Sequence, residues 1–553
     1  MTMSTPANIA QALKRGEGLI NAGRFADAAG IFREILVAAP NEVGAMVGLG
    51  LALFRIGDHA AAETALRACL QRAPMVTGAS LVLGTLLGQN GRFTEAETVM
   101  RAATQSAPKN GHVWQVLGNS LHRQGRLEEA DAAYRQALTL MPNETSLWDQ
   151  LGDVLLKRGD APAAEAAFRK AMALEARAPA PVTNLGRIQE ERGDLDAAIA
   201  LHDQAIALNP SFAFAYLNRG NARRFKNDFA GAIADFDAAL RLAPDMPEAR
   251  GCRGYTRLTI GDFANGWPDY AFRIAGQPGA FAPADATGWQ GEELSGKRVI
   301  VWTEYGLGDE ILAASLLPDL SQAAAHCTVL CEPRLVALLQ RSFPRVSVKP
   351  HTATDLGAFD FKFALADAAR YLRPDFASFP PRQAFLTPDP QRVAAIKARL
   401  PQGGNIGISW RSGSPSTGAF KSMRLADWQP IMSMPGVHFH SLQYGDTAAE
   451  IAGTEVMTDP TVDPLTDLDG FAAQVAAMDL VISVSNTTVH FAGGLGKPVW
   501  TLVPYGHGAH WYWFRDRADS PWYPTMKLFR QAAPGQWAPA LADAAAALKA
   551  WTA

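Results

Sequence analysis

The chain has 553 residues, of which 48% are hydrophobic and 19% charged, and its formal net charge at pH 7 is −3. This length allows several domains. The balance of 51 Lys and Arg against 54 Asp and Glu excludes the strongly basic surface typical of nucleic-acid binding. The four cysteines are too few and too scattered for a disulfide framework, and no apolar run reaches membrane-spanning length. With no signal-peptide pattern at the N-terminus, the sequence predicts a cytoplasmic protein without a membrane span.

The first half of the chain repeats every 34 residues, which is the period of the tetratricopeptide repeat, a unit of two helices. Three series of residues share this step. One glycine series occupies positions 16, 50, 84, 118, 152, 186, 220 and 254. A second occupies positions 23, 57, 91, 125, 159, 193 and 261, with Asn227 in the remaining slot. Proline occupies positions 40, 74, 108, 142, 210, 244 and 278, with Ala176 as the exception.

Each series has a physical role in such a unit. The first glycine lets two helices approach closely, the second lies in the turn between them, and the proline ends the second helix. We therefore predict an all-α solenoid over residues 9–280, with about eight units that bury one continuous core. The last unit carries Trp267, Tyr270 and Phe272 close together and is predicted to cap the array.

The concave face of a repeat solenoid commonly binds a segment of another protein, so a protein partner is predicted. A spacer or a dimerisation arm is the alternative interpretation, which leaves homo-oligomerisation open. The candidate groove residues that can hydrogen-bond a peptide backbone are Asn119, Asn184, Asn218 and Asn221.

Beyond Lys297 the period disappears, and short apolar runs alternate with helical stretches. This alternation predicts two parallel-sheet domains, 281–390 and 391–553, separated by a proline-rich stretch. A Pro-, Gly- and Ala-rich connector is predicted over Gln277–Gly288. The predicted strands are Val299–Thr303, Thr328–Cys331, Phe359–Ala364, Ile406–Trp410, Val437–Leu442, Leu480–Val484 and Pro498–Val503.

Polar turns follow three of these strands, at 304–310, 411–421 and 485–490. Because parallel sheets bind ligands at the carboxyl ends of their strands, we expect the three turns to face one cleft. The third turn precedes a helix predicted over Val489–Leu495, whose free N–H groups and positive dipole end favour an anion such as a nucleotide phosphate. Ordinary helix capping is the competing interpretation. The small polar side chains in this turn are Ser485, Asn486, Thr487 and Thr488.

Five motifs in the second half carry a family resemblance. They are Trp-Gln-Gly-Glu-Glu-Leu-Ser-Gly-Lys (289–297), Gly-Leu-Gly-Asp-Glu (306–310), Asp-Leu-Val-Ile-Ser-Val (479–484), His-Phe-Ala-Gly-Gly-Leu-Gly-Lys-Pro-Val-Trp (490–500) and Asp-Ser-Pro-Trp-Tyr-Pro (519–524). With these motifs, the chain resembles bacterial tetratricopeptide-repeat glycosyltransferases. Their catalytic half is similar to heptosyltransferases and, more distantly, to O-linked N-acetylglucosamine transferase.

The resemblance implies a fold class of α + α/β, in which the solenoid precedes a GT-B module of two Rossmann-like domains. The C-terminal domain of that module would hold the nucleotide sugar. The resemblance also implies inverting transfer with no metal and no resident cofactor.

For the chemistry, the resemblance implies that Asp309 is the base for the acceptor hydroxyl, with Glu310 as the adjacent alternative. Gly306 and Gly308 would let the backbone approach the substrate. The competing interpretation is that Asp309 only caps the helix that starts near Ile311.

For the donor, Arg411 and Lys421 stand at the two ends of a polar loop and are the candidates that neutralise the leaving phosphate. Heptosyltransferase relatives usually show Asp-Thr where this chain has Ser485-Asn486, which disfavours heptose as the donor sugar. The predicted donor residues are Arg411, Ser412, Lys421, Ser485, Asn486, Thr487, Thr488 and His490, and the predicted nucleobase pocket is formed by Gln443 and Tyr444.

Two other clusters have competing interpretations. Trp511, Trp513, Trp522 and Tyr523 can stack on a sugar or can simply build core. His507 and His510 have a spacing that suits a metal, yet no carboxylate or cysteine partner is evident.

The resemblance therefore implies transfer of a sugar to Ser or Thr of a protein held by the repeats. Because bacterial relatives with this layout include flagellin glycosyltransferases, flagellin is the leading acceptor. The donor is expected to be a nonulosonic acid carried by CMP or an N-acetylhexosamine carried by UDP. Two alternatives stay open. One is a non-enzymatic adaptor with a degenerate transferase half, and the other is a heptosyl-type transferase acting on lipid-linked glycans.

Overall fold

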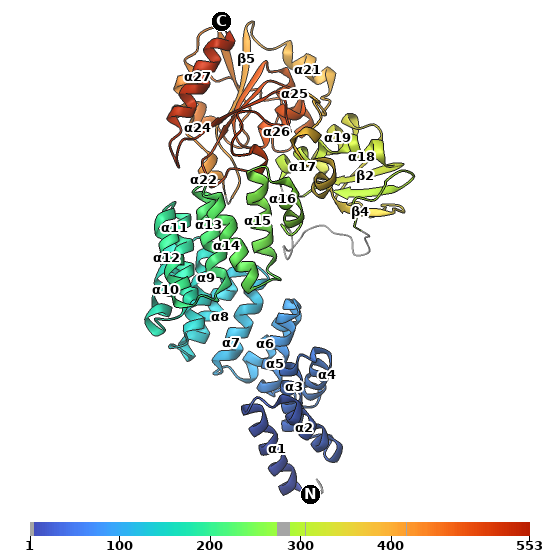
Figure 1. Cartoon of the computed structure of the whole chain (residues 1–553), viewed down its shortest axis with the longest axis vertical. Helices are drawn as coiled ribbons and strands as arrows, with labels where there is room; N and C mark the ends of the chain where they lie inside the picture. Colours follow the sequence, from blue (N-terminus) through green and yellow to red (C-terminus); the bar gives the residue numbers. More distant parts are fainter. Residues whose placement is uncertain (1–4, 274–287, 305, 416, 553) are drawn as a thin grey trace. The chain divides into compact units, whose positions relative to one another are not determined.

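The computed structural model describes residues 5–273, 288–304, 306–415 and 417–552 (Figure 1). By its internal packing the chain divides into two compact units, Met1–Ala215 and Tyr216–Ala553. The predicted boundary at 280/281 and all of the predicted connector except Gly288 lie outside the described residues. Within the described ranges, no helix combines the length and apolarity needed to cross a membrane.

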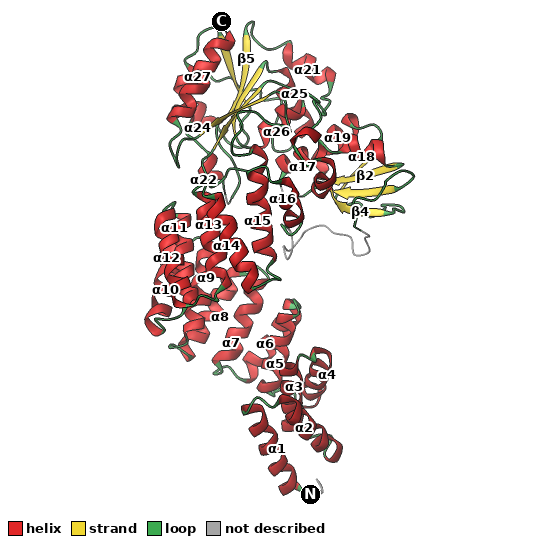
Figure 2. Cartoon of the chain, in the orientation of Figure 1, coloured by secondary structure: helices red, strands yellow, loops and turns green. Residues whose placement is uncertain are grey.

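The first unit is a row of paired helices, which confirms the predicted tetratricopeptide array (Figure 2). Gly125 and Gly159 have φ of 75° and 82°, as expected for the turn between two helices. A Cβ at Gly118 would lie 2.7 Å from the Tyr134 ring, so this glycine is needed for the close approach of two helices. The helices are α1 (Pro6–Asn21), α2 (Phe25–Ala38), α3 (Val43–Ile56), α4 (His59–Arg72), α5 (Thr77–Gln89), α6 (Phe93–Ser106), α7 (Gly111–Arg123), α8 (Leu127–Leu140), α9 (Thr145–Lys157), α10 (Ala161–Leu174), α11 (Pro179–Glu191) and α12 (Leu195–Leu208).

The second unit begins within the last repeats and continues into two parallel α/β sheets. The repeat helices are α13 (Ala213–Phe225), α14 (Phe229–Leu242), α15 (Pro247–Thr259) and α16 (Phe263–Tyr270). The first sheet has the order β3-β2-β1-β4 and the second has the order β6-β5-β7-β8-β9. The strands are β1 (Arg298–Trp302), β2 (His326–Cys331), β3 (Val346–Pro350), β4 (Phe361–Ala364), β5 (Gly404–Ser409), β6 (Val437–Ser441), β7 (Leu480–Val484), β8 (Val499–Val503) and β9 (Met526–Arg530).

Helices cover both faces of the second sheet, as in a Rossmann-like domain (Figure 2). Ile406 and Ile482 belong to the core that includes residues of α27, whereas Val481 and Val499 belong to the core that includes residues of α25 and α26. The α/β helices are α17 (Leu307–Ala314), α18 (Leu317–Ala323), α19 (Val336–Ser342), α20 (Ala369–Leu372), α21 (Pro390–Lys397), α22 (Gly418–Lys421), α23 (Gln429–Met432), α24 (Ala448–Ile451), α25 (Leu468–Ala477), α26 (Thr487–Gly494) and α27 (Ala538–Thr552).

All seven predicted strands are present, with ends that differ by up to two residues, but β3 and β9 were not predicted. Both are edge strands in which exposed or half-buried residues interrupt the buried ones. The prediction relied on uninterrupted apolar runs, which are typical of strands buried on both faces. The helix predicted over Val489–Leu495 starts two residues earlier, because Asn486 caps it.

The last repeats are fastened directly to the α/β part of the second unit. The Tyr255 hydroxyl donates to the carbonyl of Ala509 at 2.8 Å, and the Tyr505 hydroxyl donates to the carbonyl of Lys226 at 3.0 Å. Trp267 packs in the aromatic core beside Trp511, with ring centroids 5.2 Å apart. These contacts explain why the residues from Tyr216 onward pack with the sheets.

The two sheets meet through the first helices that follow β1 and β7. Helix α17 packs against α26. A Cβ at Gly308 would lie 2.7 Å from the ring of His490, so only glycine allows this approach. The polar turns after β1 and β7 are thereby held side by side.

Candidate functional site

A cavity of about 530 Å³ lies where the turns after β1, β5 and β7 converge. It collects most of the predicted site residues, which come from segments far apart in the sequence. These are Gly306, Gly308, Asp309, Ser412, Lys421, Tyr444, Ser485, Asn486, Thr487, Thr488 and His490. The polar residues that line it without having been predicted are Arg334, Ser414, Thr417, His510 and Tyr512.

Asp309 lies in the first turn of α17 and supplies the carboxylate of the cavity. Burial raises its pKa above the ordinary value, while the charge of Lys421 and hydrogen bonds from the Tyr512 hydroxyl and the Gly306 N–H act in the opposite direction. The competing interpretation, in which Asp309 caps a helix starting near Ile311, is wrong, because α17 begins at Leu307 with Gly306 as its N-cap and Asp309 lies inside the first turn, where it accepts from the Gly306 N–H. A carboxylate with a raised pKa that faces a cavity is also suited to accept a proton.

Glu310, the alternative base, is not brought to this cavity. Its carboxylate accepts hydrogen bonds from the Thr303 hydroxyl at 2.6 Å and from the Glu332 N–H at 3.0 Å. The side chain is buried against the ends of β1 and β2, where it fixes two turns. This placement favours a structural role for Glu310.

Arg411 and Gln443 also lie outside the cavity lining. The Arg411 Nε lies 3.0 Å from a Glu450 carboxylate oxygen, which occupies the guanidinium. The Gln443 carbonyl oxygen accepts from the N–H groups of Trp410 and Arg411, both at 2.9 Å, and from the Ser409 hydroxyl at 3.0 Å. Both side chains therefore shape the turn after β5. This role could not be predicted from local sequence patterns, because the partners are about 32 to 39 residues away in the chain.

Lys421 is the buried cation that lines the cavity, which Arg334 also lines. Burial lowers the pKa of Lys421 to about 8. Its Nζ lies 2.6 Å from Nε2 of His510, a histidine whose own pKa is held well below the ordinary value by burial and by the Lys421 charge. A neutral His510 accepts the hydrogen bond from the ammonium group, which fixes the cation beside the turn after β7.

A chain of hydrogen bonds connects Asp309 to the second sheet. Tyr512 donates to Asp309, and its hydroxyl lies 3.5 Å from Nε2 of His490. The Nδ1 of His490 lies 2.8 Å from the Tyr523 hydroxyl, and burial lowers the pKa of this histidine to about 3. A neutral His490 protonated at Nε2 satisfies every direction in the chain.

The helix α26 directs its N-terminus at the cavity. Asn486 caps it by accepting from the Thr488 N–H at 3.0 Å, while its amide nitrogen donates to the Ser409 hydroxyl at 2.7 Å. The capping interpretation is thus correct for Asn486. Thr488 is fully buried, and among the described residues its hydroxyl oxygen has no hydrogen-bond partner. This unused hydroxyl and the helix dipole make the spot suitable for an anion.

The aromatic residues near the C-terminus build core. Trp511, Trp513, Trp522 and Tyr523 are all buried, and the Trp513 indole N–H donates to the Ser485 hydroxyl at 2.8 Å. His507 is stacked between Phe225 and Phe420, with ring centroids 4.1 and 4.0 Å away. Across the part of the chain that the structure describes, no group of His, Cys, Asp and Glu is arranged to hold a metal ion.

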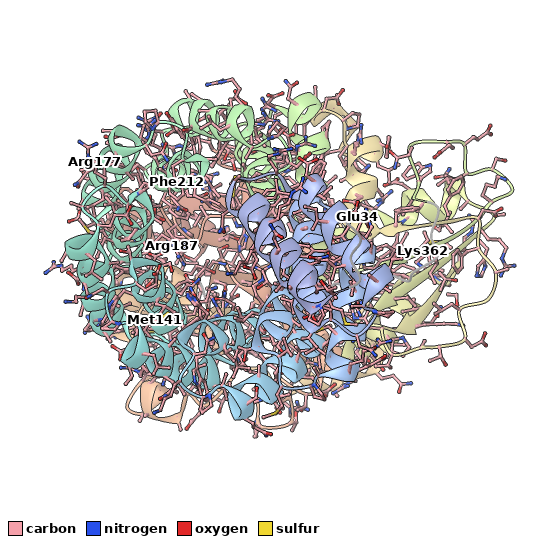
Figure 3. The ribbon with its side chains drawn as sticks, turned by 90° about the horizontal axis from the view of Figure 1, so that it is seen from below. Glu34, Met141, Arg177, Arg187, Phe212 and Lys362 are labelled. Atoms are coloured by element: carbon pink, nitrogen blue, oxygen red, sulfur yellow. The ribbon has the colours of Figure 1, made fainter. Side chains whose placement is uncertain are left out.

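Three of the four asparagines predicted for the groove have hydrogen-bond partners of their own. Asn119 accepts from the Tyr134 hydroxyl at 2.7 Å, and Asn184 donates to Asp149 at 2.8 Å. Arg187, on the same helix as Asn184, pairs with Asp153 at 2.8 Å, and Figure 3 places Arg187 toward the inner side of the curved row of helices. Helix α11 therefore presents a polar network on that side. In the second unit, Asn221 accepts from Arg224 at 3.4 Å and Asn218 is half-buried.

Comparison with known proteins relates the chain to repeat proteins. The family model described as the C-terminal domain of cilia and flagella-associated protein 70 matches residues 6–257. Protein FlbA of Caulobacter vibrioides is 36% identical over 290 residues, which is 47% of this chain and 48% of FlbA. The chain thus spans about half the length of this relative. It is a tetratricopeptide-repeat protein related to FlbA over the matched part.

Solved structures also resemble part of the chain. The Cut9–Hcn1 hetero-tetramer is 19% identical, with coverage of 49% of this chain and 53% of that one and a TM-score of 0.38. A tetratricopeptide-repeat protein of Parabacteroides merdae is 17% identical, with coverage of 43% and 94% and a TM-score of 0.39. PilF of Pseudomonas aeruginosa is 23% identical, with coverage of 38% and 95% and a TM-score of 0.32. Each of these three structures has a TM-score below 0.5.

Proposed function

We propose that the chain is an inverting, metal-independent glycosyltransferase that moves a sugar from a nucleotide to Ser or Thr of a protein acceptor. The observation that carries this proposal is the cavity between the two sheets. It places a carboxylate, Asp309, and a buried ammonium, Lys421, together with the N-terminus of α26. The resemblance to tetratricopeptide-repeat glycosyltransferases supports the same assignment.

In the proposed reaction Asp309 takes the proton from the acceptor hydroxyl. The hydroxyl oxygen then forms a bond to the anomeric carbon on the face opposite the nucleotide. The bond between that carbon and the phosphate oxygen breaks, and the phosphate leaves with the electron pair. The raised pKa of Asp309 suits the first step, because a weakly basic carboxylate would return the proton too readily.

The phosphate side of the cavity is suited to the charge of the leaving group. Lys421 and the N-terminus of α26 supply positive potential, and the Thr488 hydroxyl has a free hydrogen-bonding position. Tyr444 lines the cavity and is proposed to contact the nucleobase. The proposed donor is carried by CMP or UDP.

The repeats are proposed to hold the protein acceptor, since tetratricopeptide arrays commonly bind polypeptide segments. We propose flagellin as the leading acceptor, on the resemblance to flagellin glycosyltransferases. Part of the repeat region also matches the family model whose description names cilia and flagella. The sugar that is transferred follows from the donor and is open in this proposal.

Calorimetric titration of the full chain with CMP, UDP, GDP and ADP tests the proposal, with and without a metal chelator. We expect one nucleotide to bind with a Kd in the micromolar range, unaffected by the chelator and weakened in a Lys421→Ala variant. Hydrolysis of the corresponding nucleotide sugar should then be measurable in the absence of acceptor. Absence of binding by all four nucleotides would contradict the proposal.

A non-enzymatic adaptor is the second candidate, and one observation favours it. Arg411, Asn486 and Gln443, which were predicted to serve the donor, are all engaged in internal hydrogen bonds or ion pairs. A degenerate site would look similar. The adaptor predicts protein binding by the repeats with no nucleotide affinity, so the same titration separates the two candidates.

A further inference from the structure

A second cavity, of about 580 Å³, adjoins the one described above within the second unit. Asp309, Thr417, His510 and Tyr512 line both cavities and so form their shared wall. The remaining walls come mainly from α13, α15 and the residues just after α16, that is, from the last repeats. The proposed base is therefore accessible from two sides, one belonging to the donor and one to the repeats.

The second cavity contains an unusual cation, Arg224. Its guanidinium carbon lies 4.5 Å from the Phe225 ring centroid and 4.9 Å from that of Tyr255. Its Nε is buried without a hydrogen-bond partner, and within the described ranges it pairs with no carboxylate. An arginine that is partly desolvated between aromatic rings, and that donates to the neutral amide of Asn221 at 3.4 Å rather than to a carboxylate, favours a carboxylate ligand.

Other arginines of the last repeats differ in this respect. Arg219 and Arg223 both pair with Asp235, and Arg253 and Arg257 both pair with Asp269. These pairs hold the helices of one repeat together. Arg224 follows Arg223 directly yet has no such partner, so the pairing pattern of the repeats does not account for it.

The other charged residues that line the second cavity leave Arg224 as the position for a carboxylate ligand. Arg273 lines the cavity too, but it is buried and paired with Glu304 and Asp367. Glu248 on α15 is the acidic side chain on the repeat side, and the structure gives no ion pair between it and Arg224. Arg224 is thus the cation in this cavity that is open to a ligand.

We propose that the second cavity receives a short polypeptide segment that presents its hydroxyl to Asp309 and an acidic side chain to Arg224. The cavity is of the size that holds a few residues in an extended segment. This inference rests on the proposed transferase function and adds to it a preference for acceptor sites flanked by Asp or Glu. Arg224 is a specificity residue in this arrangement, because it contacts the acceptor beside the reacting hydroxyl.

The test measures binding of fluorescent peptides to the full chain, with turnover followed separately. The peptides carry a central threonine flanked by aspartate, by asparagine or by lysine. We expect the aspartate peptide to bind at least about tenfold more tightly than the other two, and Arg224→Gln to abolish this difference. Arg224→Lys should keep part of it, because the charge remains while the planar fork is lost.

The matched control is Arg517→Gln. Arg517 lies 5.0 Å from the Phe376 ring, and it does not line either cavity. The Arg517→Gln variant should leave the peptide preference unchanged. Thermal unfolding of each variant shows whether its fold is kept. Three results would overturn the inference. The first is equal binding of the three peptides, and the second is a preference for the aspartate peptide that survives Arg224→Gln. The third is tighter binding of the lysine peptide that is lost in Glu248→Gln.

Hydrolysis of nucleotide sugar without peptide separates this inference from the proposed function. Arg517→Gln should leave that hydrolysis unchanged, because Arg517 lines neither cavity. A chain that prefers aspartate peptides but turns over no nucleotide sugar would retain the peptide site and contradict the transferase. A chain that hydrolyses nucleotide sugars but shows no peptide preference would support the transferase and contradict the peptide site.

Discussion

The two strand–turn–helix segments at the sheet junction differ in what they present to one cavity. The segment of β1 and α17 offers Asp309, whose pKa is raised by burial. The segment of β7 and α26 offers small polar groups, a helix N-terminus and Thr488 with an unused hydroxyl oxygen. In the proposed transferase, the same backbone arrangement would supply a proton acceptor in one sheet and an anion site in the other. What distinguishes them is the side chain in the first helical turn, a carboxylate in α17 and hydroxyls in α26.

The largest effect is expected at the carboxylate. Asp309→Ala should lower the rate of sugar transfer by about 10²- to 10⁴-fold, the usual contribution of a general base. Nucleotide affinity should change little, because the proposed phosphate site lies at the other segment. Steady-state kinetics and calorimetry on the same preparation check both parts. Turnover close to wild type in Asp309→Ala would contradict the role of Asp309 as the base, and with it the functional difference between the two segments.

The contact between α17 and α26 is tested by Gly308→Ala. The added Cβ would lie 2.7 Å from the buried His490 ring, so we expect a loss of about 1–3 kcal/mol in the free energy of unfolding. Gly306→Ala is the matched control, because the nearest atom to its Cβ would lie 3.9 Å away, on the Asp309 side chain. Denaturant unfolding compares the two variants. Equal stabilities would show that the helices can separate at little cost.

The anion site is tested at Lys421. Lys421→Ala should weaken nucleotide binding by about tenfold or more, since it removes a charge-assisted hydrogen bond. The pKa of about 8 makes the wild-type affinity depend on pH, because the ammonium group is charged below this value and neutral above it. Affinity should therefore fall as pH rises from about 8, and Lys421→Arg should flatten the profile. An affinity independent of pH up to 10 would contradict the assignment.

The smallest effect is expected at Tyr512, which positions the base. Its hydrogen bond favours the ionised form of Asp309 and so lowers the pKa of that carboxyl. Tyr512→Phe should raise this pKa and move the acidic limb of the kcat/KM profile to higher pH. The loss should be severalfold below neutral pH and should shrink in alkaline solution. Tyr523→Phe is the control, because it contacts His490 rather than Asp309 and should move the limb less. Equal shifts would contradict a direct role of Tyr512.

Much of the fold was predictable because its signals are local. The 34-residue step located the repeats, and continuous apolar runs located seven strands. The unit boundary was not predictable, since the repeats that pack with the sheets keep the period of the others. The hydroxyls of Tyr255 and Tyr505 join the last repeats to the α/β part, because each donates to a carbonyl group about 250 to 280 residues away.

The sequence alone determined which turns carry polar groups, where the repeats lie and where seven of the nine described strands lie, because these follow from patterns within a few turns or strands. The tertiary structure decided which of those groups face a common cavity. Lys421 lines this cavity, whereas Arg411 forms an ion pair with Glu450, although both cations stand at the ends of one polar loop. His510 and Tyr512 became neighbours of Asp309 only through folding, since contacts over some 200 residues depend on how the sheets and helices pack.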